Sequence, residues 1–263
     1  MGLILNTSTV IRNLSIGPLS GGGNGGGGGG SSEPSSFTLA NRLFHYDYGD
    51  PTSYGGSGNY VTDLAGTIAT TQIVGPITYV NSGDGSYMQN SGTYQLSNFT
   101  NSLGQYGQPP SNTYSAWYNF SGYSGTDTAR MIAGTGGNNY RLYFDEVNNR
   151  FNVTVTIGNS LQSFYINNFS TLISAGNWFN IAIVFDSTSC IRYINGVQQA
   201  TTAHSGENWG HANDGPVSSY FNINAWYNYP YNISVAQAIY YTNALTASEV
   251  LGNFNALKSR YGY

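Results

Sequence analysis

The sequence predicts an all-β, two-sheet antiparallel sandwich, with an extended N-terminal arm before it and one short C-terminal helix at its end. Tyr (23 of 263 residues), Thr and Val suit pleated, half-buried surfaces, whereas Lys, Glu and Ala, which favour helix surfaces, are scarce. Aromatic residues make up 15% of the chain, enough apolar surface to build a core. Short alternating segments separated by turn residues recur after residue 37, and a helical period appears only after residue 245.

The first twenty residues predict an extended arm, because β-branched residues are frequent and twenty residues are too few to fold alone. Residues 21–36 (GGGNGGGGGGSSEPSS) predict a flexible linker that spans roughly 20–24 Å. The arm can therefore reach a neighbouring molecule, while residues 37–263 form the folded domain. The arm's apolar side chains are candidate contacts to that neighbour: Leu3, Leu5, Val10, Ile11, Leu14 and Ile16.

Alternation and turn residues predict strands within the domain at 113–122, 141–157, 162–169, 178–185, 190–194, 197–202, 219–226 and 233–241. The clearest hairpin signal is Asn195-Gly196, since both residues tolerate the positive φ of a type I′ turn. Asn148-Asn149 predicts a second turn of this type, which divides 141–157 into two strands.

The last segment, 245–263, predicts the helix. Thr246 and Glu249 have the spacing of a capping box, in which each side chain bonds the other residue's backbone N–H. An apolar stripe then follows at helical spacing and should face the sandwich: Val250, Phe254, Leu257 and Tyr261.

Charge and composition exclude several classes of partner. The net charge is −4 and the eight Lys and Arg residues are spread singly, so we expect no binding to nucleic acid or to an anionic membrane. No apolar run is long enough to span a bilayer, and the N-terminus lacks the pattern of a signal peptide, which predicts synthesis in a cytoplasm. Cys190 is the only cysteine, which excludes an internal disulfide.

The carboxylates do not suggest an enzyme. A retaining glycosidase needs two carboxyl groups about 5 Å apart. The glutamates are Glu33 in the linker, Glu249 in the helix cap, Glu146 near a hairpin turn, and Glu207. Asp145 and Glu146 are adjacent, so on a strand they would face opposite sides. We therefore predict no catalytic residues.

The polar segment 204–216 (HSGENWGHANDGP) is the candidate binding loop. An exposed Trp209 could anchor a sugar or a protein, with His211, Asn213 and Asp214 as polar neighbours. The alternative, in which Trp209 packs the loop against the domain, is about as well supported.

Calcium is the one ion that the sequence leaves open, because its oxygen ligands can come from loops without a strict motif. Asp47, Asp50 and Asp63 are the candidate ligands in the first part of the domain. The alternative is that these residues form ordinary Asx turns. No other metal and no organic cofactor is expected.

Three stretches resemble the concanavalin A-like, laminin-G-like jelly-roll superfamily: FHYDYGDPTSYGGSGNYVTDLAGT (44–67), WFNIAIVFDSTSCIRYINGVQ (178–198) and VAQAIYYTNALTASEVLGNFNALKSRYGY (235–263). The resemblance covers most of 44–263 and implies a jelly-roll sandwich. The third stretch is similar to versions found in tailed phages and large aquatic DNA viruses. The superfamily includes lectins, glycoside hydrolases and viral coat proteins, so the resemblance alone does not choose the function.

The hypothesis that uses both the arm and the resemblance is a decoration or cement protein on the surface of a virion. The arm would contact the major capsid protein or another virion protein, and copies of the chain would form an oligomer or a lattice. The alternative is a lectin module of a tail fibre or adhesin that binds host glycans; a glycoside hydrolase is third.

Overall fold

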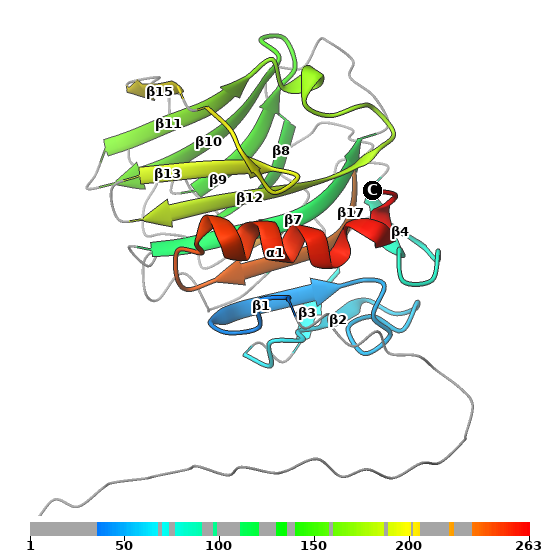
Figure 1. The fold of residues 1–263 in the computed structure, drawn as a ribbon. Helices are drawn as coiled ribbons and strands as arrows, with labels where there is room; N and C mark the ends of the chain where they lie inside the picture. Colours follow the sequence, from blue (N-terminus) through cyan, green and yellow to red (C-terminus); the bar gives the residue numbers. More distant parts are fainter. Residues whose placement is uncertain are drawn as a thin grey trace, which may run out of the picture.

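A computed structural model describes residues 36–67, 70–73, 77–90, 97–98, 111–120, 130–135, 140–157, 160–186, 189–200, 202–205, 221–223 and 233–263. Within these residues, antiparallel strands form a jelly-roll sandwich of two sheets, and one α-helix follows near the C-terminus (Figure 1). The predicted arm (1–20) and nearly all of the predicted linker (21–36) lie outside the described residues, and their role stays a prediction.

The first sheet, sheet A, has eight strands among the described residues. Its centre is β17, which pairs along one side with β7 and along the other with β5 and then β1. In spatial order the strands are β14 (Val197–Gln198), β13 (Ser189–Ile194), β12 (Trp178–Asp186), β7 (Ser111–Phe120), β17 (Ile233–Tyr241), β5 (Tyr87–Asn90) and β4 (Ile77–Val80), with β1 (Arg42–Asp47) beside β17.

The second sheet, sheet B, has nine strands in the described part of the chain. In spatial order they are β15 (Thr202–Ser205), β11 (Ser160–Asn167), β10 (Arg150–Ile157), β9 (Tyr140–Asp145), β8 (Arg130–Thr135), β16 (Phe221–Ile223), β6 (Ser97–Asn98), β3 (Thr70–Gln72) and β2 (Tyr60–Thr62). A short 3₁₀ turn, η1 (Phe169–Thr171), follows β11. β9, β10 and β11 pair as consecutive hairpins and so form one continuous surface.

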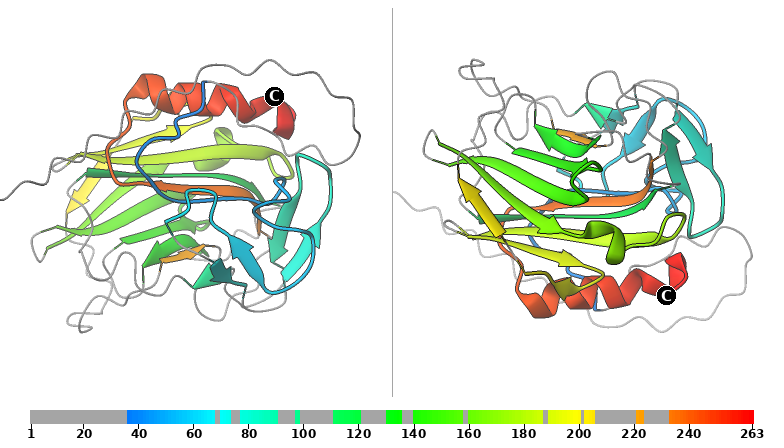
Figure 2. Two further views of the ribbon diagram at one scale, coloured as in Figure 1. Left: turned by 90° about the horizontal axis from the view of Figure 1, so that it is seen from below. Right: turned by 90° about the horizontal axis from the view of Figure 1, so that it is seen from above.

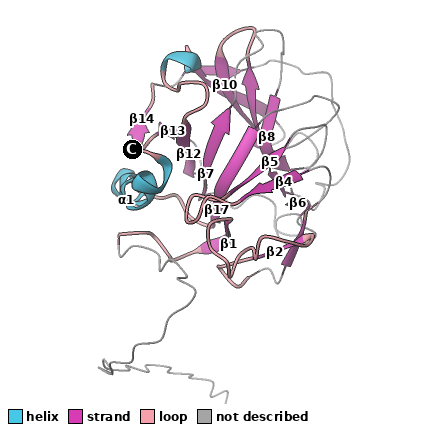
Figure 3. Cartoon of the chain, turned by 90° about the vertical axis from the view of Figure 1, so that its right-hand side faces the viewer, coloured by secondary structure: helices cyan, strands magenta, loops and turns pink. Residues whose placement is uncertain are grey.

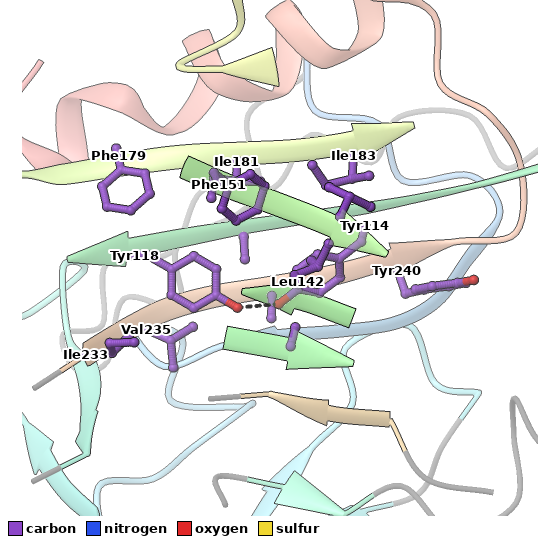
Figure 4. Packing of buried hydrophobic residues seen from close by; sticks show 14 of the residues in the cluster. Tyr114, Tyr118, Leu142, Phe151, Phe179, Ile181, Ile183, Ile233, Val235 and Tyr240 are labelled. Carbon is purple, nitrogen blue, oxygen red and sulfur yellow. Dashed lines mark hydrogen bonds between the residues drawn. The ribbon is translucent and has the colours of Figure 1, made fainter. Parts of the chain in front are cut away.

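The main core lies between the sheets because every second residue of each strand points inward. Tyr114 and Tyr118 of β7 are fully buried there, and their hydroxyls share a 2.6 Å hydrogen bond that satisfies both polar ends (Figure 4). Phe151 and Val153 of β10 face them from sheet B. The inner surfaces of the two sheets are therefore fully used by packing.

A second core lies on the other side of sheet A, under the helix α1 (Ala247–Leu257) and the 3₁₀ turn η2 (Lys258–Tyr261). Figures 2 and 3 show the helix lying along the outer side of sheet A. The predicted stripe is buried, and Trp117 of β7 stacks on Tyr261 with ring centroids 4.3 Å apart. The capping box of Thr246 and Glu249 is present, as the sequence predicts.

Two of the predicted turns have different outcomes. Asn195 and Gly196 both have positive φ, so this hairpin is the predicted type I′ turn. Between β9 and β10 the loop has four residues, and of the two asparagines predicted there only Asn149 has positive φ, so the type I′ prediction was wrong at this turn. The strand expected at 197–202 also ends early, at Gln198, because the chain then leaves sheet A and joins sheet B as β15.

Candidate functional site on the outer face of sheet B

In the described part of the chain, the outer face of sheet B is the sheet surface that belongs to neither of the two hydrophobic cores. The inner faces of both sheets form the main core, and α1 and η2 pack on the outer face of sheet A. Neither of these helical segments lies over sheet B (Figure 2). Relative to the main core, this surface is the opposite side of β9, β10 and β11.

Strand alternation makes that surface polar along three neighbouring strands. Inward positions of β9, β10 and β11 are apolar and belong to the core, such as Leu142, Phe151 and Ile166. The alternate positions point the other way and carry hydroxyl, amide, phenol or guanidinium groups. We call this set the polar face: Arg141, Tyr143, Arg150, Asn152, Thr154, Ser163 and Tyr165.

Asn152 lies in the middle of one row of the polar face. Its register partners are Tyr143 on β9 and Tyr165 on β11, so an amide stands between two phenol rings. The side chain is 6% exposed, and its Nδ2 has no hydrogen-bond partner in the structure. An unsatisfied buried amide costs about 1–3 kcal/mol, which a ligand oxygen accepting from Nδ2 would recover.

The neighbouring positions hold the other polar groups in fixed places. Tyr143, Thr154 and Ser163 are buried, as Asn152 is, whereas Arg141, Arg150 and Tyr165 are partly exposed. Thr154 Oγ1 and Ser163 Oγ are 3.5 Å apart across β10 and β11. At the end of the strands, the guanidinium of Arg150 lies 4.5 Å from the centre of the Tyr165 ring. Aromatic rings beside amides and a guanidinium can bind a sugar ring by stacking and by hydrogen bonds.

The loop residues predicted as binding residues, Trp209, His211, Asn213 and Asp214, lie outside the described residues, as do the arm residues predicted to contact a partner. Both predictions therefore stay predictions.

The three candidate calcium ligands are each bound by donors of the chain itself. Asp47 is buried and forms two hydrogen bonds of 2.7 and 2.8 Å with Arg260. Asp63 accepts from the backbone N–H groups of His45, Ala65 and Thr67. Asp50 accepts from the backbone and the hydroxyl of Thr52.

These contacts are Asx-turn and ion-pair chemistry, and calcium would need six to eight oxygens around one point. Across the residues that the structure describes, no three His, Cys, Asp or Glu side chains group in a way that could hold a metal ion. A role for calcium at Asp47, Asp50 and Asp63 stays a prediction without support from this geometry.

A second polar cluster lies around His45 of β1, which is fully buried. Its ring nitrogens lie against the guanidinium of Arg42 and the carboxamide of Gln237, which also donates to Asp47. Burial, with the positive charges of Arg42 and Arg260, lowers the pKa of His45 well below its ordinary value. The imidazole is therefore neutral at neutral pH, and the cluster joins β1, β17 and the C-terminal turn.

Sequence reasoning missed the polar face because it used the alternation of 141–167 only as evidence for strands. The signal was present: nearly all positions between the apolar ones carry Tyr, Asn, Asp, Thr, Ser or Arg, with Leu161 near the start of β11 as an exception. What the sequence could not supply is the register that aligns Tyr143, Asn152 and Tyr165 in one row. Among the described helices, none is both long and apolar enough to cross a membrane.

Solved structures with a similar fold are receptor-binding domains of botulinum neurotoxins. One is the binding domain of botulinum neurotoxin DC in complex with rat synaptotagmin II, with a TM-score of 0.62 and 14% identity; the match covers 83% of this chain and 52% of that one. The same domain in complex with SialylT matches with a TM-score of 0.61, 15% identity, and 83% and 52% coverage.

A third similar structure comes from a study of botulinum neurotoxin type C, whose cell entry depends on interaction with two ganglioside molecules. It has a TM-score of 0.60 and 14% identity, again over 83% of this chain and 52% of that one. The chain thus spans about half the length of these structures, and identities this low show a shared fold alone. No curated protein sequence matches the chain significantly.

The sequence profile described as "Concanavalin A-like lectin/glucanases superfamily" matches residues 81–251, more than half of the chain. The matched span runs from just before β5 to the middle of α1 and includes every strand of the polar face. It also agrees with the two-sheet architecture and with the resemblance seen in the sequence. The chain therefore belongs to the concanavalin A-like lectin/glucanases superfamily.

Proposed function

We propose that this chain is a lectin-like binding module that takes a glycan on the polar face of sheet B. The observation that carries the proposal is the row Tyr143–Asn152–Tyr165, in which a nearly buried amide donor without a partner stands between two phenol rings. A fold that only had to be stable would place an apolar side chain at Asn152 or pair the amide. The unpaired donor is what a recognition site requires before its ligand arrives.

The similar structures support a role in binding. They are botulinum neurotoxin structures: a binding domain in complex with synaptotagmin II or with SialylT, and a type C toxin whose cell entry depends on gangliosides. We infer by analogy that a cell-surface receptor or glycan is the partner of this chain.

The same proposal makes the chain a binder rather than an enzyme. The carboxylate next to the polar face, in register with Arg150, is Asp145, and its two oxygens accept from the backbone and the side chain of Asn148. Glu146 follows it directly in the sequence, so the two do not face each other as an acid and a nucleophile must.

A glycan array probed with the full chain tests the proposal. We expect binding to a defined subset of glycans and at least a tenfold loss of affinity in Tyr165→Ala, because the variant removes a flanking ring of the row. The matched control is Tyr60→Ala, which removes an exposed tyrosine of β2, elsewhere on sheet B. No binding to any glycan, or equal losses in the two variants, would contradict the proposal.

We also propose that the chain is attached to a larger particle, such as a virion, through residues 1–20. The support is the sequence: a segment with several apolar residues, too short to fold alone, precedes a glycine-rich linker. The described domain begins at Ser36, and the described residues of both cores, from Phe37 under α1 onward, follow the arm and the linker.

Deleting residues 1–20 should leave the melting temperature of the domain unchanged and abolish its co-sedimentation with particles. Retention of normal occupancy on particles by the truncated chain would contradict attachment through the arm. Glycan binding by the same truncated protein should persist, which separates the two proposals.

A further inference from the structure

We infer that the polar face selects sugars that carry a carboxylate, such as sialic or uronic acids; this rests on the proposed glycan site. The groups that the face leaves for a ligand are hydrogen-bond donors. Arg150 is partly exposed and offers the N–H groups of its guanidinium, while the Nδ2 of the neighbouring Asn152 is a buried donor without a partner, two residues along the same strand. A ligand that satisfies them must supply acceptor oxygens, and a carboxylate supplies the strongest pair.

Arg150 is held ready for a carboxylate. Its guanidinium lies 4.5 Å from the centre of the Tyr165 ring, so stacking occupies the flat face of the group. The N–H groups in the plane of the guanidinium stay available, and their fork matches the two oxygens of a carboxylate. Since the stack already fixes the side chain, less entropy is lost when the pair forms.

The carboxylate opposite Arg150 is already hydrogen-bonded to another residue. Asp145 is the register partner of Arg150 across β9 and β10. Its Oδ1 accepts from the backbone N–H of Asn148 at 2.9 Å and its Oδ2 from Asn148 Nδ2 at 2.7 Å. Both oxygens of Asp145 thus bind Asn148 within the turn, and the structure shows no ion pair between Asp145 and Arg150. The guanidinium thus keeps its charge for a ligand.

Asn152 places a second donor at a distance that one sugar residue can bridge. Residues 150 and 152 are two apart on β10 and point to the same side, so their Cα atoms are roughly 6.5–7 Å apart. A sugar whose carboxylate pairs with Arg150 can therefore present a ring or hydroxyl oxygen to Asn152 Nδ2. Arg141, further along β9, adds a second positive charge to the polar face.

Calorimetric titration of the full chain with two matched pairs of sugars tests the inference: sialyllactose against lactose, and methyl glucuronide against methyl glucoside. The members of the second pair differ only in the acid. We expect the acidic member of at least one pair to bind about tenfold or more tightly, and the preference to weaken as NaCl is raised. Glucose 6-sulfate, a sugar whose negative charge is not a carboxylate, should bind more weakly than the glucuronide.

Two variants and one control assign the preference to Arg150. Arg150→Met keeps the packing on Tyr165 but removes the charge and the donors, so the acidic and neutral sugars should bind equally. Arg150→Lys keeps the charge without the fork and should retain only part of the preference. Lys258→Met removes a positive charge near the C-terminal helix and should leave the preference intact. Melting curves show that each variant is folded.

The outcomes separate this inference from the proposed function. Equal binding of acidic and neutral sugars by the wild type would overturn the inference and leave a glycan site in place. A preference that survives Arg150→Met, or a sulfate bound as tightly as the carboxylate, would overturn the assignment to a carboxylate at Arg150. No binding of any sugar would overturn the proposed function, and the inference with it.

Discussion

Arg192 of β13 is a buried guanidinium with no hydrogen-bond partner for Nε, Nη1 or Nη2 in the structure. It lies on the side of β13 that faces sheet B, 5.5 Å from the centre of the Phe164 ring. Burial lowers its pKa, while the neighbouring Cys190 acts in the opposite direction. Arg260, by contrast, is paired: both of its terminal nitrogens donate to the buried carboxylate of Asp47.

Two arginine-to-methionine variants should therefore change stability in opposite directions. Replacing a buried cation that has no partner by an apolar side chain of similar length should raise the free energy of unfolding, by about 1–4 kcal/mol for Arg192→Met. Arg260→Met should lower it by about 3–5 kcal/mol, since Asp47 is left buried and unpaired. Urea unfolding measures both. If Arg192→Met is as destabilising as Arg260→Met, then the chain outside the described residues supplies a counter-charge to Arg192.

At the scale of single elements, local signals predicted the structure well where the cause is local. The capping box, the apolar stripe of the helix and the Asn195-Gly196 turn each depend on residues a few positions apart, and all three are present. The end of β14 and the four-residue loop before β10 depend on which strand the following segment pairs with, and that pairing involves residues far away in the sequence or in the neighbouring strand. The sequence has no local mark for these.

The cap of α1 allows a direct measurement at this scale. Thr246→Ala removes the hydroxyl that accepts from the N–H of Glu249, and should cost about 1 kcal/mol in the free energy of unfolding. Ser248→Ala is the matched control, because it removes an exposed hydroxyl in the first turn of the same helix and should change stability by less than about 0.5 kcal/mol. Equal effects of the two variants would mean that packing on sheet A alone fixes the start of the helix.

The candidate site shows the opposite balance between sequence and structure. The residue types on the polar face could be predicted from the alternation of the sequence. That Asn152 lies between Tyr143 and Tyr165 could not, because it depends on the register of three strands. That Asn152 Nδ2 lacks a hydrogen-bond partner depends on the packing around it, which the sequence does not show either. The sequence drew attention to the loop around Trp209 because an exposed aromatic among polar residues is a local pattern. Sites assembled from neighbouring strands have no such pattern.

For the whole molecule, the buried His45 predicts loss of stability in acid. The pKa of His45 is about 6.5 in the unfolded chain and lower in the folded protein. As the pH falls below 6.5, the imidazole of the unfolded chain therefore binds a proton while that of the folded protein stays neutral. Stability is therefore full above pH 6.5 and falls as the pH drops below it. Arg42 and Arg260 act in this direction, while the carboxylates of Asp47 and Asp63 also lie close to the residue.

The free energy of unfolding should thus fall between pH 6.5 and pH 5.5 by up to about 1 kcal/mol from this group. His45→Gln keeps a polar side chain without an ionisable ring, and should reduce the slope over this interval even if it lowers stability overall. Urea unfolding at half-unit pH steps measures the slope. An unchanged slope in the variant would assign the acid sensitivity to other groups.

The pairing of β1 with β17 has a consequence for biosynthesis. Phe44 on the first strand lies opposite Tyr240 on the last strand of sheet A, and Arg260 then binds Asp47. At roughly 5–20 residues per second, a ribosome needs about 10–40 s to make the chain between Phe44 and Tyr240. During that time β1 has no partner, so the sandwich cannot close strand by strand as it emerges. Its completion waits for the last residues, and a nascent chain that stalls before residue 233 would present a sheet without its centre.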